Sequence, residues 1–325
     1  LTYFAMKQTL SSMAWCLIAG TLLFLGTSCK KTATDFGGSD ELIRLNAYRN
    51  LHYPESRRLA GDAFVQTLKP NAEGASLATG GWLYFDYWAT DLDGTLLATS
   101  LSDKAKEYGQ YTSTSYYTPR YKALTANGVG TTLNEALNTA HIGEELVVGL
   151  PASQAQALSL WKNANYHSAL LYLIPRQLVS DPKAHEKELI DAYMSSHPGF
   201  EAADKVYRKI ETAGTGAEIK SSSTVWVQYA IYSLSGYLFD TNIAETAQQH
   251  GRYSSSSNKY GLLSMKATED KKLITGFSGL TVGLKTGTKL RAIIPSEVGY
   301  GESGRGEIRP NEPLLVELNI VRSSN

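Results

Sequence analysis

The stretch Val225-Trp-Val-Gln-Tyr-Ala-Ile-Tyr232, followed by Leu234-Ser-Gly236 and Tyr237-Leu-Phe-Asp240, decides the fold of the C-terminal half of the chain. Its first part is rich in β-branched and aromatic residues, which are typical of strands. A turn that contains a glycine then leads into a second, shorter part of the same character. Two such parts on either side of a glycine turn predict an antiparallel hairpin.

A copy of this stretch lies 142 positions earlier, where Gly81-Trp-Leu-Tyr-Phe-Asp-Tyr-Trp88 precedes a turn at Leu92-Asp-Gly94. Two later pairs of segments repeat at shifts of 144 and 145, and these are Gly287–Pro295 with Gly143–Pro151 and Leu314–Ile320 with Ala169–Pro175. Nearly constant shifts mean that the loops of the two copies differ little in length. We interpret the chain as two copies of one domain.

Each copy also contains one short helical segment. Gly276–Leu284 places three apolar side chains at three- and four-residue spacing, and its counterpart is Thr132–Ala140. Longer helices are expected near Asp40–Ala60 and near Lys183–Ser195, the second of which ends at His197-Pro-Gly199. Antiparallel strands with one covering helix per copy predict an α+β fold in which each sheet wraps over a short helix.

The composition excludes several classes of function. The chain has 325 residues, of which 42% are hydrophobic and 19% charged, enough for two compact domains. Its 31 basic and 31 acidic residues cancel, so no net positive field exists to bind a nucleic acid. The two cysteines, Cys16 and Cys29, both precede the folded part, and the six histidines show no ligand spacing. We expect no disulfide, metal site or cofactor there.

The N-terminal segment has the pattern of an export signal. Lys7 is followed by an apolar stretch from Met13 to Leu25, which is too short to span a bilayer, and then by Gly26-Thr-Ser-Cys29. This order resembles a bacterial lipoprotein signal peptide, in which the cysteine becomes the lipidated first residue. A buried N-terminal helix is the alternative, but Lys30-Lys31 and the polar residues after them favour a tether. The resemblance implies lipidation of Cys29 and a place in the cell envelope, on the periplasmic face or the outer surface of a membrane.

Seven motifs in the second copy follow one another from Lys205 to the C-terminus. They are Val227-Gln-Tyr229, Gly236–Asp240, Leu273-Ile-Thr-Gly-Phe277, Gly287-x-Lys289, Ile294-Pro295, Gly299-Tyr-Gly301 and Arg309-Pro-Asn311. In this order and with these gaps, the second copy resembles the FKBP-type peptidyl-prolyl cis-trans isomerases. Together with the N-terminal pattern and the internal repeat, the resemblance implies two FKBP-like domains and the following divisions: signal peptide 1–28, lipidated tether 29–40, degenerate FKBP-like domain with an N-terminal helix 41–180, linker helix 181–204 and isomerase domain 205–325.

The resemblance also implies a proline-binding pocket in the second copy. Its catalytic residues would be Asp240, Tyr300 and Phe277, and its substrate-binding residues Tyr229, Phe239, Leu273, Ile274, Ile308 and Val316. Phe277 stands where the family usually has a tryptophan beneath the proline ring. Glu307 takes a place that is usually apolar, and the long segment Thr241–Lys272 offers only Arg252 as a candidate partner for Asp240. What this segment does stays open, and a flap that selects client proteins is one hypothesis.

The residues themselves admit a plainer interpretation. Tyr229, Phe239, Phe277 and Val316 stand where a sheet packed on a helix needs large apolar groups, and Asp240 stands where a turn often has a local backbone cap. Tyr300, between two glycines, is harder to explain by packing. Gly299-Tyr-Gly-Glu-Ser-Gly304 also fits a dinucleotide-binding pattern, but no apolar-periodic helix follows it.

The first copy has lost most of the residues that the resemblance assigns to the pocket. Leu97, Ala98, Leu133 and Gln156 stand at the positions of Phe239, Asp240, Phe277 and Tyr300, and only Tyr87 is retained. We therefore expect no isomerase activity from residues 41–180. The tyrosines of this copy, which include Tyr108, Tyr111, Tyr116, Tyr117 and Tyr121, offer an aromatic contact surface for a protein, or else ordinary loop packing.

Prolyl isomerisation needs neither a proton nor a nucleophile. Rotation about a peptide bond costs about 18–20 kcal/mol because resonance gives the bond partial double-bond character. An apolar, aromatic pocket disfavours the planar polar ground state more than the twisted one. We predict an isomerase that assists exported or envelope proteins to fold, with proline-containing unfolded chains as partners. The alternative is a noncatalytic lipoprotein that binds partners in an envelope complex.

Overall fold

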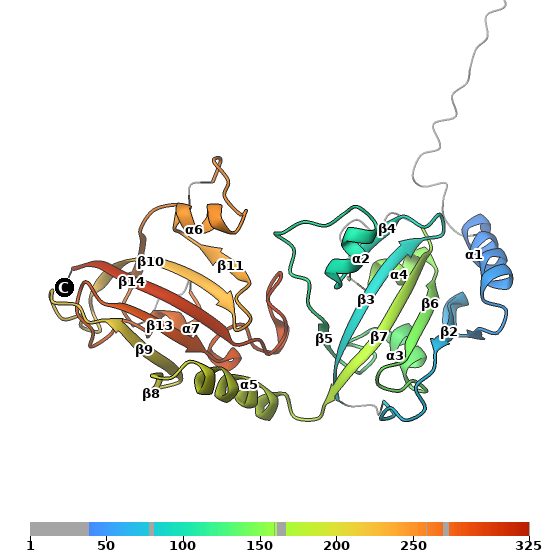
Figure 1. Ribbon diagram of the computed structural model, residues 1–325, viewed down its shortest axis with the longest axis horizontal. Coiled ribbons are helices and arrows are strands. Elements are labelled where there is room, and N and C mark those ends of the chain that lie inside the picture. Colours follow the sequence, from blue (N-terminus) through green and yellow to red (C-terminus); the bar gives the residue numbers. More distant parts are fainter. Residues whose placement is uncertain are drawn as a thin grey trace, which may run out of the picture. The chain divides into compact units, whose positions relative to one another are not determined.

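The computed structural model describes residues 39–77, 81–158, 160, 167–257, 259–268 and 273–324. Within them lie two seven-stranded sheets in which every strand pairing is antiparallel (Figure 1). This confirms the antiparallel part of the predicted α+β fold. The predicted signal peptide and the lipidation site Cys29 lie outside the described residues. None of the described helices is both long and apolar enough to cross a membrane.

The two sheets have the same strand order. The first runs β1-β2-β6-β7-β3-β4 with β5 on β3, and its strands are β1 (Arg57–Arg58), β2 (Phe64–Lys69), β3 (Trp82–Asp91), β4 (Leu96–Thr99), β5 (Arg120–Ala123), β6 (Glu145–Leu150) and β7 (Ala169–Val179). The second runs β8-β9-β13-β14-β10-β11 with β12 on β10, and its strands are β8 (Glu201–Ala203), β9 (Val206–Thr212), β10 (Thr224–Ser233), β11 (Leu238–Thr241), β12 (Leu263–Lys266), β13 (Lys289–Ile294) and β14 (Leu314–Ser324). The long central pairs, β3 with β7 and β10 with β14, occupy equivalent places, so the sequence repeat is also a structural repeat.

The helices are short apart from two. They are α1 (Ser39–His52), α2 (Ser102–Glu107), α3 (Thr131–Leu137), α4 (Ala152–Ala157), α5 (Pro182–Ser196), α6 (Ala244–Gln249) and α7 (Thr275–Ser278). The predicted helix Asp40–Ala60 was too long at its C-terminal end, because Pro54 disfavours helical geometry at the residue before it and β1 follows. The segment Gly276–Leu284 was also predicted too long: α7 ends at Ser278, although Phe277 and Leu280 are both buried as expected.

Both predicted hairpin turns form, and α5 extends one residue beyond the predicted helix Lys183–Ser195 at each end. Gly94 and Gly236 adopt φ values of 86° and 89°, a region that glycine occupies without the steric penalty of a side chain. At α5 the Asp181 carboxylate accepts hydrogen bonds from the backbone N–H groups of Lys183 and Ala184, and Pro182 occupies the first turn. The helix stops at His197, directly before Pro198.

Helices α1 and α5 cover equivalent faces of the two sheets. Leu45 of α1 packs with Phe64, Val147 and Leu170 on the first sheet. On the second sheet, the corresponding cluster joins Ile190 of α5 to Ile293 and Leu315. The helix interpreted as a linker therefore packs on the second sheet as α1 packs on the first.

A hydrogen-bonded glutamate joins each of these helices to the rest of its copy, and Glu41 is partly buried whereas Glu186 is buried. Glu41 of α1 accepts a hydrogen bond of 3.1 Å from the Ala152 backbone N–H, and it also accepts one from the Ser168 hydroxyl. Glu186 of α5 accepts from the backbone N–H and the hydroxyl of Ser296, at 2.5 and 2.7 Å. Burial raises the pKa of both carboxyls. These hydrogen bonds satisfy backbone N–H groups that follow the equivalent prolines of the two copies.

We expect Glu186→Ala to lower the free energy of unfolding by about 1–3 kcal/mol, because the buried N–H and hydroxyl of Ser296 lose their acceptor. Urea denaturation followed by circular dichroism measures this. Glu188→Ala is the matched control, since Glu188 lies on the same helix with a side chain that is 79% exposed. Equal effects of the two variants would contradict the role given to Glu186.

Candidate functional site

The second sheet carries a pocket of about 620 Å³. Strands β10, β11 and β12 form one side of it, and α7 with the loop after β13 forms the other. Its lining residues are Tyr229, Ile231, Phe239, Asp240, Leu263, Leu273, Ile274, Phe277, Tyr300, Arg305, Gly306, Glu307 and Ile308. Most of these side chains are apolar or aromatic, so the pocket suits an apolar group of a ligand.

Phe277 forms the floor of the pocket. It is 3% exposed, and the ring of Tyr229 meets it edge-on, with centroids 5.6 Å apart and planes at 83°. Gly276 lets α7 approach the sheet closely, because a Cβ atom there would lie only 2.5 Å from Ile294 Cγ2. The close approach of the helix sets the depth of the floor.

Asp240 lies at the rim and has two partners. The Tyr229 hydroxyl donates a hydrogen bond of 2.8 Å to its Oδ2, and the Lys259 ammonium lies 3.0 Å from its Oδ1. Burial, with a smaller contribution from the hydrogen bond to Asp240, raises the pKa of Tyr229. The phenol therefore stays protonated and serves as a donor at neutral pH. The sequence-based candidate partner, Arg252, was wrong, because Lys259 takes this place.

Arg252 instead binds the loop that carries Glu307. Its Nη2 lies 2.5 Å from Glu307 Oε2, and its Nη1 donates to the carbonyl of Phe239 at 3.1 Å. Tyr237 also contacts both charged groups, and its hydroxyl lies 2.9 Å from Glu307 Oε1. The negative charge that Glu307 brings to an otherwise apolar wall is thus compensated by a neighbouring guanidinium.

All but one of the predicted site residues line this pocket. The exception is Val316, whose exposure is 0% because it belongs to the core between Ala292 and Ile231 of the neighbouring strands. Its assignment as a substrate-binding residue is corrected accordingly. The sequence analysis missed Ile231, Leu263, Arg305, Gly306 and, as a lining residue, Glu307. For Ile231 a signal existed, since it follows Tyr229 by two positions on a strand and so shares its face.

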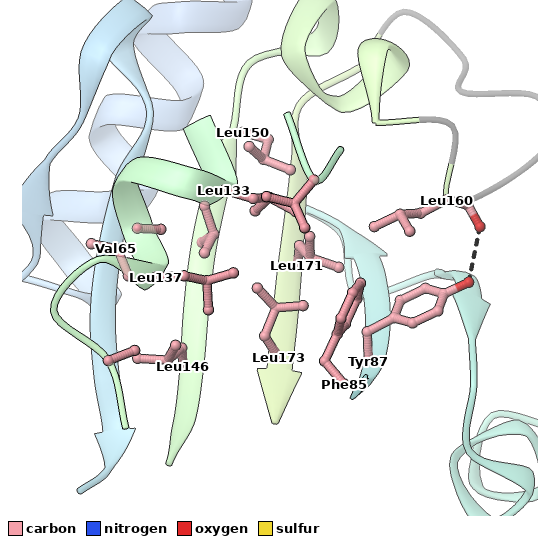
Figure 2. Packing of buried hydrophobic residues seen from close by; sticks show 14 of the residues in the cluster. Val65, Phe85, Tyr87, Leu133, Leu137, Leu146, Leu150, Leu160, Leu171 and Leu173 are labelled. Atoms are coloured by element: carbon pink, nitrogen blue, oxygen red, sulfur yellow. Dashed lines mark hydrogen bonds between the residues drawn. The ribbon is translucent and has the colours of Figure 1, made fainter. Parts of the chain in front are cut away.

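The equivalent region of the first sheet is filled by its own side chains (Figure 2). Tyr87, the counterpart of Tyr229, has no exposed surface, and its hydroxyl donates a hydrogen bond of 2.9 Å to the carbonyl of Leu160. Leu133, the counterpart of Phe277, is 1% exposed among the leucines of the core. Leu97 and Ala98 pack against the same core, and Gln156 is exposed on α4.

Among the described residues, no group of three or more His, Cys, Asp or Glu side chains is arranged to hold a metal ion. The pocket offers hydroxyl groups, backbone groups and two carboxylates, each paired with a cation, around an apolar interior. Such a site suits an apolar ring or side chain of a ligand.

The C-terminal segment is similar to one known protein family. Residues 216–321 match the family model described as FKBP-type peptidyl-prolyl cis-trans isomerase. A probable FKBP-type peptidyl-prolyl cis-trans isomerase of Haemophilus influenzae is 32% identical over 117 residues, which are 35% of this chain and 40% of that protein. FK506-binding protein 1 of Aspergillus oryzae is 28% identical over 118 residues, which are 36% of this chain and 97% of that protein. These matches support membership of the C-terminal segment in the FKBP-type isomerase family.

Solved structures are similar to the chain at a lower level. A peptidyl-prolyl cis-trans isomerase from Pseudomonas syringae has a TM-score of 0.35 and 24% identity, and the match covers 44% of this chain and 94% of that one. FkpA from Escherichia coli has the same TM-score and identity, over 45% of this chain and 60% of that one. The chain therefore spans only part of FkpA, as it spans only part of the Haemophilus protein.

The two equivalent tyrosines give a direct test of the difference between the sheets. We expect Tyr87→Phe to lower the free energy of unfolding by about 0.5–1.5 kcal/mol, because the hydrogen bond from the buried Tyr87 hydroxyl to the carbonyl of Leu160 is lost. Tyr229→Phe should cost less, because Asp240 keeps Lys259 and contact with solvent in the open pocket. Urea titrations of both variants measure this, and a larger cost at Tyr229 would contradict the description of the two sites.

Proposed function

We propose that the chain is an FKBP-type peptidyl-prolyl cis-trans isomerase whose catalytic domain is residues 205–325. In the same proposal, residues 41–180 form an FKBP-like domain without activity. The pocket on the second sheet carries the proposal, because it brings together the apolar and aromatic residues that the family resemblance assigns to proline binding. The family match over residues 216–321 supports it.

Each residue has a physical role in this proposal. Phe277 supports the proline ring from below, and Phe239 and Ile274 enclose it from the sides. Transfer of the imide from water into this enclosure disfavours the planar, charge-separated form relative to the twisted one. The Tyr300 hydroxyl has no hydrogen-bond partner among the described residues, so it is available to donate to a carbonyl of the substrate, as is the backbone N–H of Ile274.

In this proposal, Asp240 acts on the pocket by positioning Tyr229. Its carboxylate holds the Tyr229 hydroxyl, and that tyrosine in turn meets the floor ring edge-on. No step transfers a proton, so no group of the pocket has to change its protonation state.

The proposal extends to the setting of the reaction. Lipidation at Cys29 would anchor the chain to a membrane in the cell envelope, where its substrates would be exported proteins that are still unfolded. The N-terminal pattern of a charged residue, an apolar stretch and Gly26-Thr-Ser-Cys29 supports this part of the proposal. Metabolic labelling with a radioactive fatty acid tests it, with Cys29→Ala as the unlabelled control.

Isomerase activity is tested on the compact unit Phe36–Asn325 with a proline-containing peptide. We expect this unit to accelerate the cis-to-trans exchange above its spontaneous rate. Tyr300→Phe should lower kcat/KM by about fivefold, because one hydrogen bond of about 1 kcal/mol to the substrate is lost. Asp240→Ala should also lower it. Gln156→Ala, at the position of Tyr300 in the first copy, is the matched control and should leave the rate unchanged.

A parent rate equal to the spontaneous rate would reject the enzyme and favour a noncatalytic binding protein. A parent that is active but insensitive to both substitutions in the pocket would place the activity elsewhere in the chain.

A further inference from the structure

The segment between α2 and β5 of the first copy contacts the outer side of the pocket on the second sheet. The ring of Tyr116 stacks on Tyr237, with centroids 4.3 Å apart and planes at 20°. The same ring stands edge-on to Phe239, at 5.4 Å and 90°. Phe239 lines the pocket, whereas Tyr116 does not. The tyrosine therefore supports a wall of the pocket from behind.

Hydrogen bonds fix Tyr116 in this place. Its hydroxyl donates a bond of 2.7 Å to Oε1 of Glu312, whose exposure is 5%. Glu312 also binds Arg309, which donates to the hydroxyl of Thr118 at 3.1 Å and to the carbonyl of Pro119 at 3.2 Å. A buried ion pair is costly unless further hydrogen bonds satisfy it, and residues of the first copy supply those bonds here.

A second contact involves the backbone of Thr114. Its carbonyl accepts a hydrogen bond of 3.0 Å from Arg252 and lies 2.6 Å from the hydroxyl of Tyr237. Arg252 also pairs with Glu307, another lining residue of the pocket. The segment thus contacts residues around the pocket through an aromatic ring and a backbone carbonyl, and both of these groups meet Tyr237.

The ring contacts hold Phe239, a side chain that has to stay in place for the proposed reaction. Phe239 is only partly buried, and two aromatic rings, those of Tyr116 and Tyr237, hold it edge-on. Without Tyr116, one face of Tyr237 and one edge of Phe239 would be open to water, and the phenylalanine would gain rotamer freedom. A wall that moves encloses the substrate less well.

We propose that Tyr116 of the first copy is a positioning residue for the pocket of the second, and that it acts by holding Phe239. This inference rests on the proposed isomerase function. It gives the first copy, in which the equivalent region is filled, a role in the reaction, since its segment 108–119 completes the support of a wall that the second copy builds only in part.

The test uses the unit Phe36–Asn325 with three variants. Tyr116→Ala removes the ring, Tyr116→Phe keeps the ring but not the hydrogen bond to Glu312, and Tyr111→Ala is the control. Tyr111 belongs to the same segment, is 48% exposed and stacks on Tyr117. We expect Tyr116→Ala to lower kcat/KM by about three- to tenfold, mainly through KM, while Tyr116→Phe restores most of the activity and Tyr111→Ala has none of the effect.

Amide hydrogen exchange of β11 provides a readout that does not depend on turnover. Tyr116→Ala should speed exchange at Leu238–Thr241, and Tyr111→Ala should not. An active parent whose kcat/KM and β11 exchange are both unchanged by Tyr116→Ala would overturn the inference and leave the isomerase function standing. A parent without activity would reject the proposed function, and the exchange measurement would then decide whether Tyr116 holds the wall.

Discussion

The apolar face of each sheet has to be covered, and the volume of the covering segment determines whether a pocket remains. In the first sheet, α3 contributes Leu133, Ala136 and Leu137, all nearly inaccessible to solvent, and together with Leu160 they fill the space beside Tyr87. In the second sheet, α7 is shorter and its single large side chain is Phe277. The volume that is not filled there is the pocket of about 620 Å³. Packing in the one sheet and binding in the other thus follow from the same constraint.

The two copies share the elements that stabilise the fold and differ in the residues that line the pocket. Both copies have the same strand order, a helix on the equivalent face (α1 or α5) and a hydrogen-bonded glutamate on that helix (Glu41 or Glu186). Phe239, Asp240 and Tyr300 occur only in the second. The first copy, whose equivalent region is filled by its own side chains, places the segment around Tyr116 beside Phe239. The two copies therefore differ in their contributions to one site.

The sequence predicted the strands well because alternation and glycine turns are local signals. Both hairpins lie where Gly94 and Gly236 required them, and the pocket residues followed from motifs within single strands or turns. Contacts across long loops could not be predicted in this way. Lys259 and Arg252 both lie in the long segment Thr241–Lys272. How that segment folds determines that Lys259 pairs with Asp240, whereas Arg252 pairs with Glu307. Val316 was wrongly predicted to line the pocket. Whether a residue of β14 lies in the core or in the pocket depends on how far α7 covers that strand, and the sequence does not show this.

Intermolecular nuclear Overhauser effects between a proline-containing peptide and the unit Phe36–Asn325 measure the central claim most directly. The pocket on the second sheet should bring the protons of the proline ring close to the aromatic protons of Phe277, with further contacts to Tyr229 and Tyr300. Contacts between the proline ring and residues of the first sheet, with none to Phe277, would contradict the account.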